Sequence, residues 1–303
     1  MTWGQSGAWS MASGSRSPGK WPERNRVQLQ SQFRLNDHTA LPVLGFGTNV
    51  LKGESGIEAL KTALKAGYRL IDTAQSYGNE EEIGKAIKES RIPRKEVYIT
   101  TKIADENQGY QKALDSFQQS LEKLQTDYVD LLLVHWPNIN HFDRSIETYQ
   151  ALIDLRQQGK VKTIGVSNYT PELIQDTIDA THVVPAVNQV EFHPFLFQKA
   201  LLDYCNERVI RIESYCPIAR AEKTDTPALQ HLAGKYGKSP VQIILRWHLE
   251  HSLIPIPRSK DPDHIKANAE IFDFSLTGEE VASLDSLDEN YRIVNPEKGP
   301  TSW

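Results

Sequence analysis

Four polar residues at or near the ends of apolar segments suit proton transfer. Asp72, Lys102 and His135 each close an apolar run, and Tyr77 follows Asp72 by five residues. If those runs are neighbouring parallel strands, their C-terminal ends meet at one rim of a sheet and gather the four side chains there. A phenol beside an ammonium, a carboxylate and an imidazole can protonate an oxygen on which negative charge builds.

The expected roles follow from ordinary acid–base chemistry. A tyrosine phenol has a pKa of about 10, and a cation within about 4–6 Å lowers it, so Lys102 should lower the pKa of Tyr77. Buried Asp72 should keep Lys102 charged, and neutral His135 can orient a substrate carbonyl. Each residue alone has a structural explanation, such as a salt bridge between Asp72 and Lys102. Their joint occurrence at one rim favours catalysis.

Composition excludes several other classes of protein. The chain has 303 residues, a net charge of −5 and 39% hydrophobic residues, without a basic patch or a long apolar run. These features argue against nucleic-acid and membrane partners. Two cysteines, Cys205 and Cys216, are too few for a disulfide framework and indicate a cytoplasmic protein. No His and carboxylate spacing suggests a metal site.

Residues 1–26 differ from the rest of the chain. They are rich in Gly, Ser and Arg, with tryptophans at no regular period, and they lack the apolar segment of a secretory signal. We expect a disordered leader that is native, a transit segment or an addition made for expression. Residues 27–303 are expected to form one domain, whose tail from Val294 to Trp303 folds over the active-site rim.

The remaining sequence predicts a hairpin and then eight alternating strands and helices. The hairpin pairs 33–35 with 39–41 around a turn at 36–38. Alternation with short connections predicts a parallel sheet, and eight units are what a (β/α)₈ TIM barrel requires. An open doubly wound sheet is the alternative, but no G-x-G-x-x-G follows the first strand. Two later strands are expected at 183–190 and 209–214.

The rim also offers partners for a hydride-donating cofactor. Ser167, Asn168 and Gln189 provide the amide and hydroxyl groups that a carboxamide needs, and Tyr215 offers a flat face for stacking. Past the last strand, the basic segment 258–260 precedes a helix starting at Pro262 and could bind phosphate. Its ordinary alternative is a solvated basic loop.

Six ordered motifs in the chain resemble the aldo-keto reductase family, and the match covers nearly all of Val27–Trp303. The motifs are Leu44-Gly45-Phe46-Gly47-Thr48; Gly67-Tyr68-Arg69-Leu70-Ile71-Asp72-Thr73-Ala74 with Tyr77-Gly78-Asn79-Glu80; Ile99-Thr100-Thr101-Lys102; Val134-His135-Trp136-Pro137; Ile164-Gly165-Val166-Ser167-Asn168; and Ile256-Pro257-Arg258-Ser259.

The resemblance implies an NADPH-dependent carbonyl reductase, monomeric as such proteins often are, and most similar to the microbial diketogluconate-reductase-like branch. It implies Tyr77 as the general acid, Lys102 and Asp72 as its tuning pair, and His135 as the group that orients a small carbonyl substrate. Asn49, Tyr77, His135 and Trp136 would contact that substrate. The implied cofactor residues are Gly47, Thr48, Asn49, Asp72, Ser167, Asn168, Gln189, Tyr215, Cys216, Pro217, Ile218, Arg258, Ser259, Lys260, His264 and Asn268.

The chain departs from the family pattern at four positions. His264 stands where an Arg is common, Ala267 where an acidic residue is frequent, and Arg258 where a Lys is usual. A neutral imidazole lacks the fixed charge and the fork of a guanidinium, so we expect NADPH to be preferred with weaker use of NADH. Asn49 replaces a common aromatic and leaves more room for the substrate. The functional alternative is a non-catalytic NADPH-binding regulatory or sensor module, similar to channel β-subunits.

Overall fold

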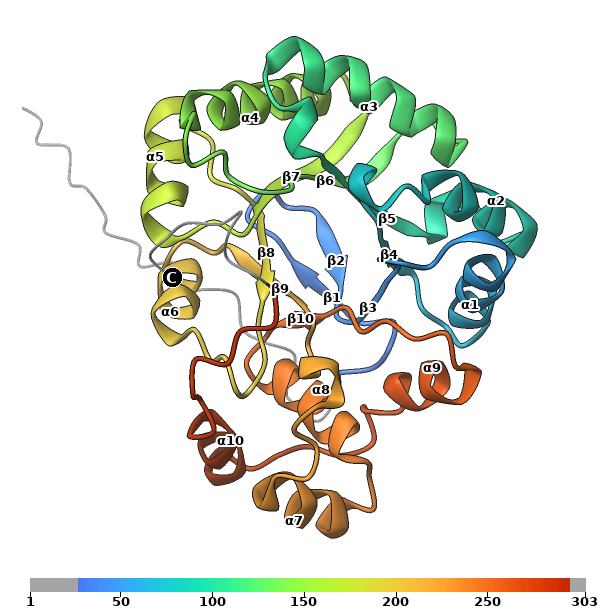
Figure 1. Ribbon diagram of the computed structural model, residues 1–303, viewed down its shortest axis with the longest axis vertical. Helices are drawn as coiled ribbons and strands as arrows, with labels where there is room; N and C mark the ends of the chain where they lie inside the picture. The colour runs from blue at the N-terminus through green and yellow to red at the C-terminus, as the bar shows by residue number, and fades with distance from the viewer. Residues whose placement is uncertain (1–26, 295–303) are drawn as a thin grey trace, which may run out of the picture.

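Eight parallel strands form a barrel in the computed structural model, which describes residues 27–294 (Figure 1). The predictions for the leader at 1–26 and for the tail beyond Val294 lie outside these residues. Each strand pairs with its sequence neighbour. The strands are β3 (Gly45–Gly47), β4 (Leu70–Asp72), β5 (Tyr98–Ile103), β6 (Val129–Val134), β7 (Val161–Ser167), β8 (Val187–Glu191), β9 (Arg211–Tyr215) and β10 (Ile254–Pro255).

A seam between the first and last of these strands closes the barrel. Gly47 N donates a hydrogen bond to Pro257 O at 3.1 Å. The approach needs glycine, because an added Cβ at Gly45 would lie 2.7 Å from Ile256 Cγ2 and one at Gly47 would lie 2.8 Å from Ile256 O. The barrel prediction is therefore confirmed over the open-sheet alternative.

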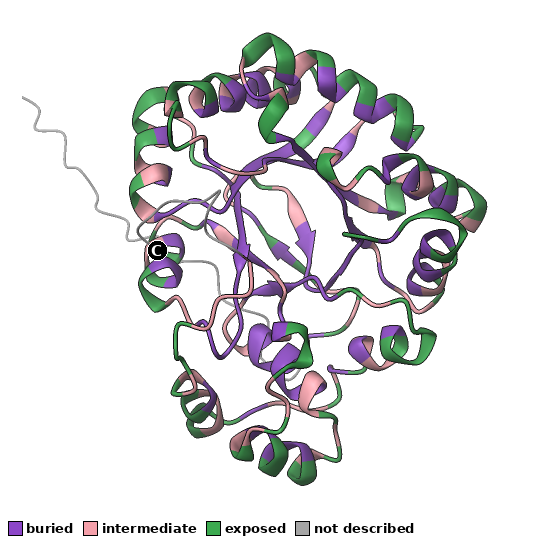
Figure 2. Cartoon of the chain, viewed as in Figure 1, coloured by how far each residue is buried: buried purple, intermediate pink, exposed green. Residues whose placement is uncertain are grey.

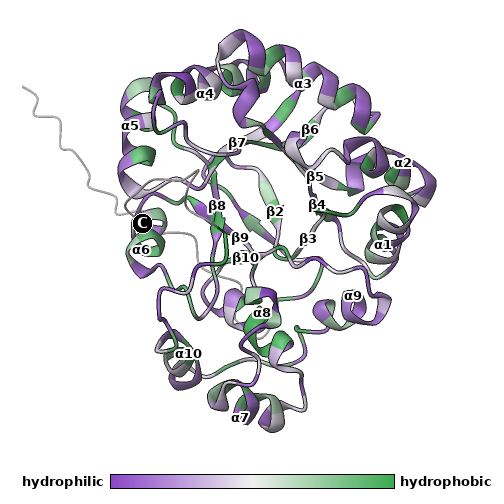
Figure 3. Cartoon of the chain, viewed as in Figure 1, coloured by the Kyte–Doolittle hydropathy of each residue, from purple (hydrophilic) through white to green (hydrophobic). Residues whose placement is uncertain are grey.

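Helices surround the strands, with their apolar faces turned inward. Strands and inner helix faces are buried (Figure 2) and rich in hydrophobic residues (Figure 3), whereas the outer faces are exposed and mostly hydrophilic. In the described residues, each helix is too short or too polar to span a bilayer. The helices are α1 (Gly53–Lys65), α2 (Glu80–Ser90), α3 (Tyr110–Leu124), α4 (Phe142–Gln157), α5 (Pro171–Thr181), α6 (Lys199–Glu207), α7 (Pro227–Tyr236), α8 (Pro240–Glu250), α9 (Pro262–Ala269) and α10 (Gly278–Asp285).

Local sequence signals explain where these helices begin and end. Helix α1 buries Ile57, Leu60 and Leu64 on one face, as their spacing predicts, and Gly67 follows it with φ of +102°. At α8, Ser239 forms a capping box with Gln242, which satisfies backbone N–H groups that the helix itself cannot.

The hairpin is confirmed, and two strand boundaries are corrected. Strands β1 (Gln32–Arg34) and β2 (Ala40–Pro42) are antiparallel. Strand β8 begins at Val187 rather than 183, because Pro185 lacks an N–H and its carbonyl accepts a hydrogen bond from Asn36. Strand β9 begins at Arg211 rather than 209, because Val209 adopts φ of +58° in the preceding turn.

Candidate active site

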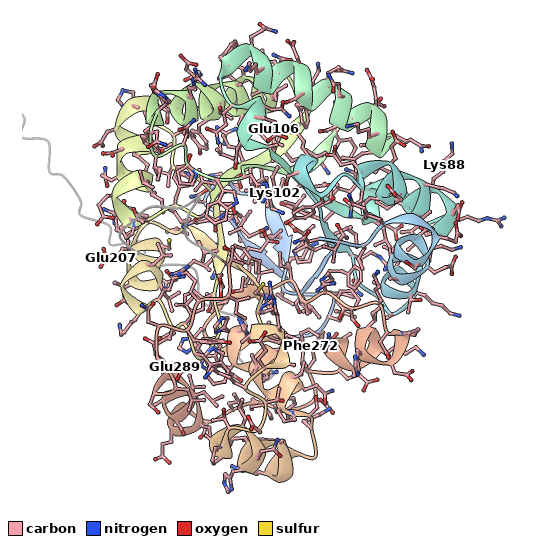
Figure 4. The ribbon with its side chains drawn as sticks, in the orientation of Figure 1. Lys88, Lys102, Glu106, Glu207, Phe272 and Glu289 are labelled. Carbon is pink, nitrogen blue, oxygen red and sulfur yellow. The ribbon has the colours of Figure 1, made fainter. Side chains whose placement is uncertain are left out.

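A cavity of about 410 Å³ opens at the C-terminal ends of the strands. It brings together most of the residues that the sequence singled out, and Lys102 lies behind it, inside the ring of strands (Figure 4). The predicted residues that line the cavity are Gly47, Thr48, Asn49, Asp72, Tyr77, His135, Trp136, Ser167, Asn168, Gln189, Tyr215, Cys216, Pro217, Ile218 and Arg258.

Lys102 is fully buried and makes four polar contacts. Its Nζ donates to Asp72 Oδ1 and Oδ2 at 2.8 Å each, to Thr73 O at 2.9 Å and to Tyr77 Oη at 3.2 Å. Burial lowers the pKa of Lys102, but Asp72 and Tyr77 raise it more, so the net shift is upward. The ammonium is thus held in its charged form, as the sequence predicted.

The pKa of Tyr77 is raised above its ordinary value, which corrects the expectation that Lys102 produces a net lowering. Burial is the largest cause and raises the value; the charge of Lys102 lowers it, and Asp72 raises it again. The charge of Lys102 therefore offsets part of the rise in the Tyr77 pKa that burial causes, but it does not bring that pKa below its ordinary value. With its pKa raised, the Tyr77 phenol carries its proton at neutral pH.

The hydroxyl hydrogen of Tyr77 is not used in the hydrogen bond with Lys102, so it is available to another acceptor. An ammonium has no acceptor lone pair, so Lys102 must be the donor in that 3.2 Å contact. The phenol oxygen accepts, and its own O–H can point to a different acceptor. The cavity is where that acceptor would lie, since Tyr77 lines it.

His135 is held beside Tyr77 by a residue that the sequence analysis missed. Ser76 Oγ lies 3.2 Å from His135 Nδ1, and the imidazole packs edge-on against the Tyr77 ring with centroids 5.8 Å apart. The contact orients the imidazole, and with it the second ring nitrogen, Nε2. Ser76 adjoins Tyr77 in the motif, but no side-chain pattern indicated that it would reach His135.

Asn168 is fixed by neighbours at or just past the ends of three strands, β6, β7 and β9. Its Nδ2 donates to His135 O at 3.0 Å and to Ser167 Oγ at 3.1 Å, and its Oδ1 accepts from Tyr215 Oη at 2.7 Å. The residue adopts φ of +66°, a conformation that asparagine tolerates better than most residues. The rim therefore presents rigid amide and hydroxyl groups beside the face of Tyr215.

The expected phosphate end is more open. Arg258, Lys260 and His264 are exposed, and of these Arg258 lines the cavity. The start of α9 is already capped, because Asp261 Oδ1 accepts from Asp263 N at 2.8 Å and from His264 N at 3.1 Å. The helix entrance expected to bind phosphate thus has an acidic cap, which leaves the basic side chains as the groups for an anion. Ser259, Lys260, His264 and Asn268 lie outside the cavity lining.

The loop after β9 has an unusual backbone. Cys216, Ala219, Arg220 and Ala221 have φ between +46° and +61°, which is unfavourable for residues with a Cβ. Arg220 lines the cavity, although sequence reasoning did not select it. A run of positive φ without glycine has no sequence signature that could have revealed it.

Glu191 at the end of β8 fixes the last described residues of the chain. Its buried carboxylate accepts from Ile293 N at 2.7 Å and from Val294 N at 2.9 Å. Val294 in turn lines the cavity. Sequence reasoning did not reveal this contact between Glu191 and the end of the described chain.

The chain matches a known protein family and individual proteins along most of its length. The aldo/keto reductase family model matches residues 43–289. The chain is 41% identical over 274 residues to glyoxal reductase of Bacillus subtilis (strain 168), covering 90% of this chain and 98% of that protein. It is 43% identical over 255 residues to 2,5-diketo-D-gluconic acid reductase B of Corynebacterium sp. (strain SHS752001), covering 84% and 92%.

A solved structure gives the same result for the fold. The crystal structure of a Bombyx mori aldo-keto reductase in complex with NADP superimposes with a TM-score of 0.83 at 33% identity, covering 90% of this chain and 98% of that one. The chain therefore belongs to the aldo/keto reductase family, and it is an oxidoreductase.

Proposed function

We propose that this enzyme reduces aldehydes and activated ketones to alcohols with NADPH, and that Tyr77 donates the proton. The observation that carries the proposal is the 3.2 Å contact in which Lys102 donates to the Tyr77 oxygen. It places a buried cation against the phenol and leaves the phenolic hydrogen for a substrate.

The proton step uses three side chains. The nicotinamide cofactor, when bound, supplies a hydride to the carbonyl carbon. The carbonyl oxygen gains negative charge and takes the Tyr77 proton, so the O–H bond of the phenol breaks as that of the alcohol forms. Lys102 stabilises the phenolate that remains, and His135 Nε2 hydrogen-bonds the carbonyl oxygen and fixes its orientation.

The residues at the rim fit a nicotinamide. Tyr215 offers an aromatic face, and the fixed groups of Ser167, Asn168 and Gln189 match a carboxamide. Arg258 and Lys260 favour a phosphate-bearing cofactor. His264, which lacks the fixed charge of an arginine, and the carboxylate of Asp261 at the start of α9 make phosphate binding weaker. We infer that NADPH is preferred and that NADH is used less efficiently. The Bombyx mori protein was crystallised with NADP, which supports this assignment.

Small polar carbonyl compounds are the proposed substrates. The two bacterial relatives are named for reduction of glyoxal and of 2,5-diketo-D-gluconic acid. Asn49 and Trp136 line the cavity, and the small amide at 49 leaves space for hydroxylated or carboxylated chains. The assignment of individual residues to cofactor binding and to substrate binding belongs to the same proposal.

The test is steady-state oxidation of NADPH with a panel of aldehydes, including glyoxal and 4-nitrobenzaldehyde, repeated with NADH. Turnover with NADPH and lower kcat/KM with NADH are expected. NADPH binding without turnover of any carbonyl compound would support a non-catalytic sensor instead. Equal or better efficiency with NADH at neutral pH would contradict the cofactor preference.

A further inference from the structure

A second carboxyl group is buried beside the Asp72–Lys102 pair. Glu213 extends from β9 into the barrel and has no exposed surface. Gln189 Nε2 donates to Asp72 Oδ1 and to Glu213 Oε2, both at 2.8 Å. One side-chain amide thus joins two carboxyl groups through both of its hydrogens.

Glu213 lacks a charge partner of its own. Its Oε1 has no hydrogen-bond partner among the described residues, and within residues 27–294 no cation forms an ion pair with it. Lys102 is nearby but makes its ion pair with Asp72. A buried carboxylate without a partner is costly, and the group relieves that cost by keeping its proton.

The surrounding strands contribute few other titratable groups. Strand β10 has none; β5 contributes Tyr98 as well as Lys102, and β8 contributes Glu191, which binds the tail. On β9 itself, Arg211 and Tyr215 share the face of Glu213, two residues away on either side. Burial first, and the charge of Asp72 second, raise the pKa of Glu213 to about 8, against smaller opposing effects of Gln189 and Lys102. The carboxyl group is therefore neutral at neutral pH and ionises in mildly alkaline solution.

We propose that Glu213 is a proton-dependent charge beneath the nicotinamide end of the cavity, and that its ionisation shifts the binding preference of the protein from NADPH toward NADP⁺. This inference rests on the proposed function. Gln189 lines the cavity and contacts Glu213 directly, so a single side chain separates the carboxyl group from a bound ligand.

The direction of the effect follows from the ligand charges. The oxidised nicotinamide ring carries one positive charge and the reduced ring carries none. An anion at Glu213 attracts the oxidised ring and leaves the reduced ring nearly unaffected. At an effective dielectric constant near 20, one unit charge about 12 Å from another changes an affinity ratio roughly tenfold, and a shorter separation changes it more.

The experiment measures the dissociation constants of NADPH and NADP⁺ by isothermal titration calorimetry between about pH 6 and about pH 9.5. Both ligands share the adenosine 2′-phosphate, so the ratio of their constants cancels pH effects on binding at that end of the ligand. In the wild-type protein, NADP⁺ is expected to gain roughly tenfold relative to NADPH as pH rises through about 8. In Glu213→Gln, which keeps the size of the side chain, the ratio should not change over this range.

Glu80→Gln is a matched control. Glu80 is another buried glutamate whose pKa is raised by burial, but it hydrogen-bonds Thr101 and Ser120, and it is not part of the cavity lining. This variant should retain the wild-type pH response. A flat ratio in the wild type, or an unchanged response in Glu213→Gln, would overturn the inference; no binding of either nucleotide would instead contradict the proposed function.

Thermal unfolding tests the ionisation independently of any ligand. The folded protein holds the Glu213 proton more tightly than the unfolded chain does, so this group destabilises the fold progressively as pH rises from about 4.3 toward about 8. The Tm of the wild type should therefore fall relative to that of Glu213→Gln across this interval. A constant Tm difference would show that Glu213 does not titrate there and would refute the inference.

Discussion

The two ends of the cavity are built in opposite ways. At one end, Lys102 is enclosed and contacts Asp72 and Tyr77. At the other end, Arg258 and Lys260 are exposed to solvent. A buried charge needs partners within the folded protein because water cannot solvate it. Water solvates an exposed charge until a ligand binds.

The contrast distinguishes residues that act in the chemical step from residues that determine cofactor affinity. Groups at the buried end are positioned before any ligand arrives, so changes there should affect the chemical step and the stability of the fold. Groups at the exposed end gain their partners on binding, so changes there should affect affinity and salt dependence. The predictions below test this division.

Tyr77→Phe should have the largest effect. Loss of the phenolic proton should lower kcat by about 10³-fold, within the range for general acid catalysis. The dissociation constant of NADPH should change less than about twofold, since the ring and its contacts remain. A variant with more than a tenth of the wild-type kcat would exclude Tyr77 as the proton donor.

Lys102→Met should impair both activity and folding. It leaves Asp72 buried without its cation, which should cost about 3–5 kcal/mol of unfolding free energy, measurable by urea denaturation. Adding Asp72→Asn removes the uncompensated charge and should restore much of the stability without restoring turnover. If the double variant regained activity, the tuning role of Lys102 would be wrong.

Arg258→Ala should raise the dissociation constant of NADPH about five- to tenfold with little change in kcat, because it removes a charged contact at the rim. The loss should shrink with added salt. Lys199→Ala is a control, since Lys199 is an exposed lysine paired with Asp203 on α6 and does not line this cavity. An unchanged NADPH affinity would place the phosphate elsewhere.

His264→Arg should have the smallest effect and the opposite sign. A fixed charge with a planar fork should strengthen NADPH binding about two- to fivefold and leave NADH nearly unchanged. The ratio of the two dissociation constants is the measurement. Equal gains for both nucleotides would show that position 264 does not contact the 2′-phosphate.

The sequence was sufficient for the barrel because eight strand and helix patterns alternate with short connections, which predicts a closed parallel sheet. The same rule predicted that Asp72, Lys102 and His135 would meet, since the C-terminal ends of parallel strands share one rim. It could not predict the raised pKa of Tyr77, because the balance between burial and the charge of Lys102 depends on distances.

Other features were missed because they depend on loop geometry or on which side chains face the inside of the barrel. The contact of Ser76 with His135 requires a specific turn after β4, and the cap at Asp261 depends on the exact start of α9. Glu213 could have been found from alternation in β9, where Arg211, Glu213 and Tyr215 share one face. Strand β9 is short and mostly polar, so the alternation of its side chains did not stand out in the sequence.

The seam between β3 and β10 has a consequence for the dynamics of the barrel. It joins the two ends of the strand order through Gly47 and Pro257, so it brings together the two strands of the barrel that are farthest apart in the sequence. Gly47 and Thr48 line the cavity from one side of the seam, and Pro257 and Arg258 line it from the other. A cofactor bound there would clasp the first strand to the last, so amide hydrogen exchange at Gly47 should slow on binding more than exchange in the central strands.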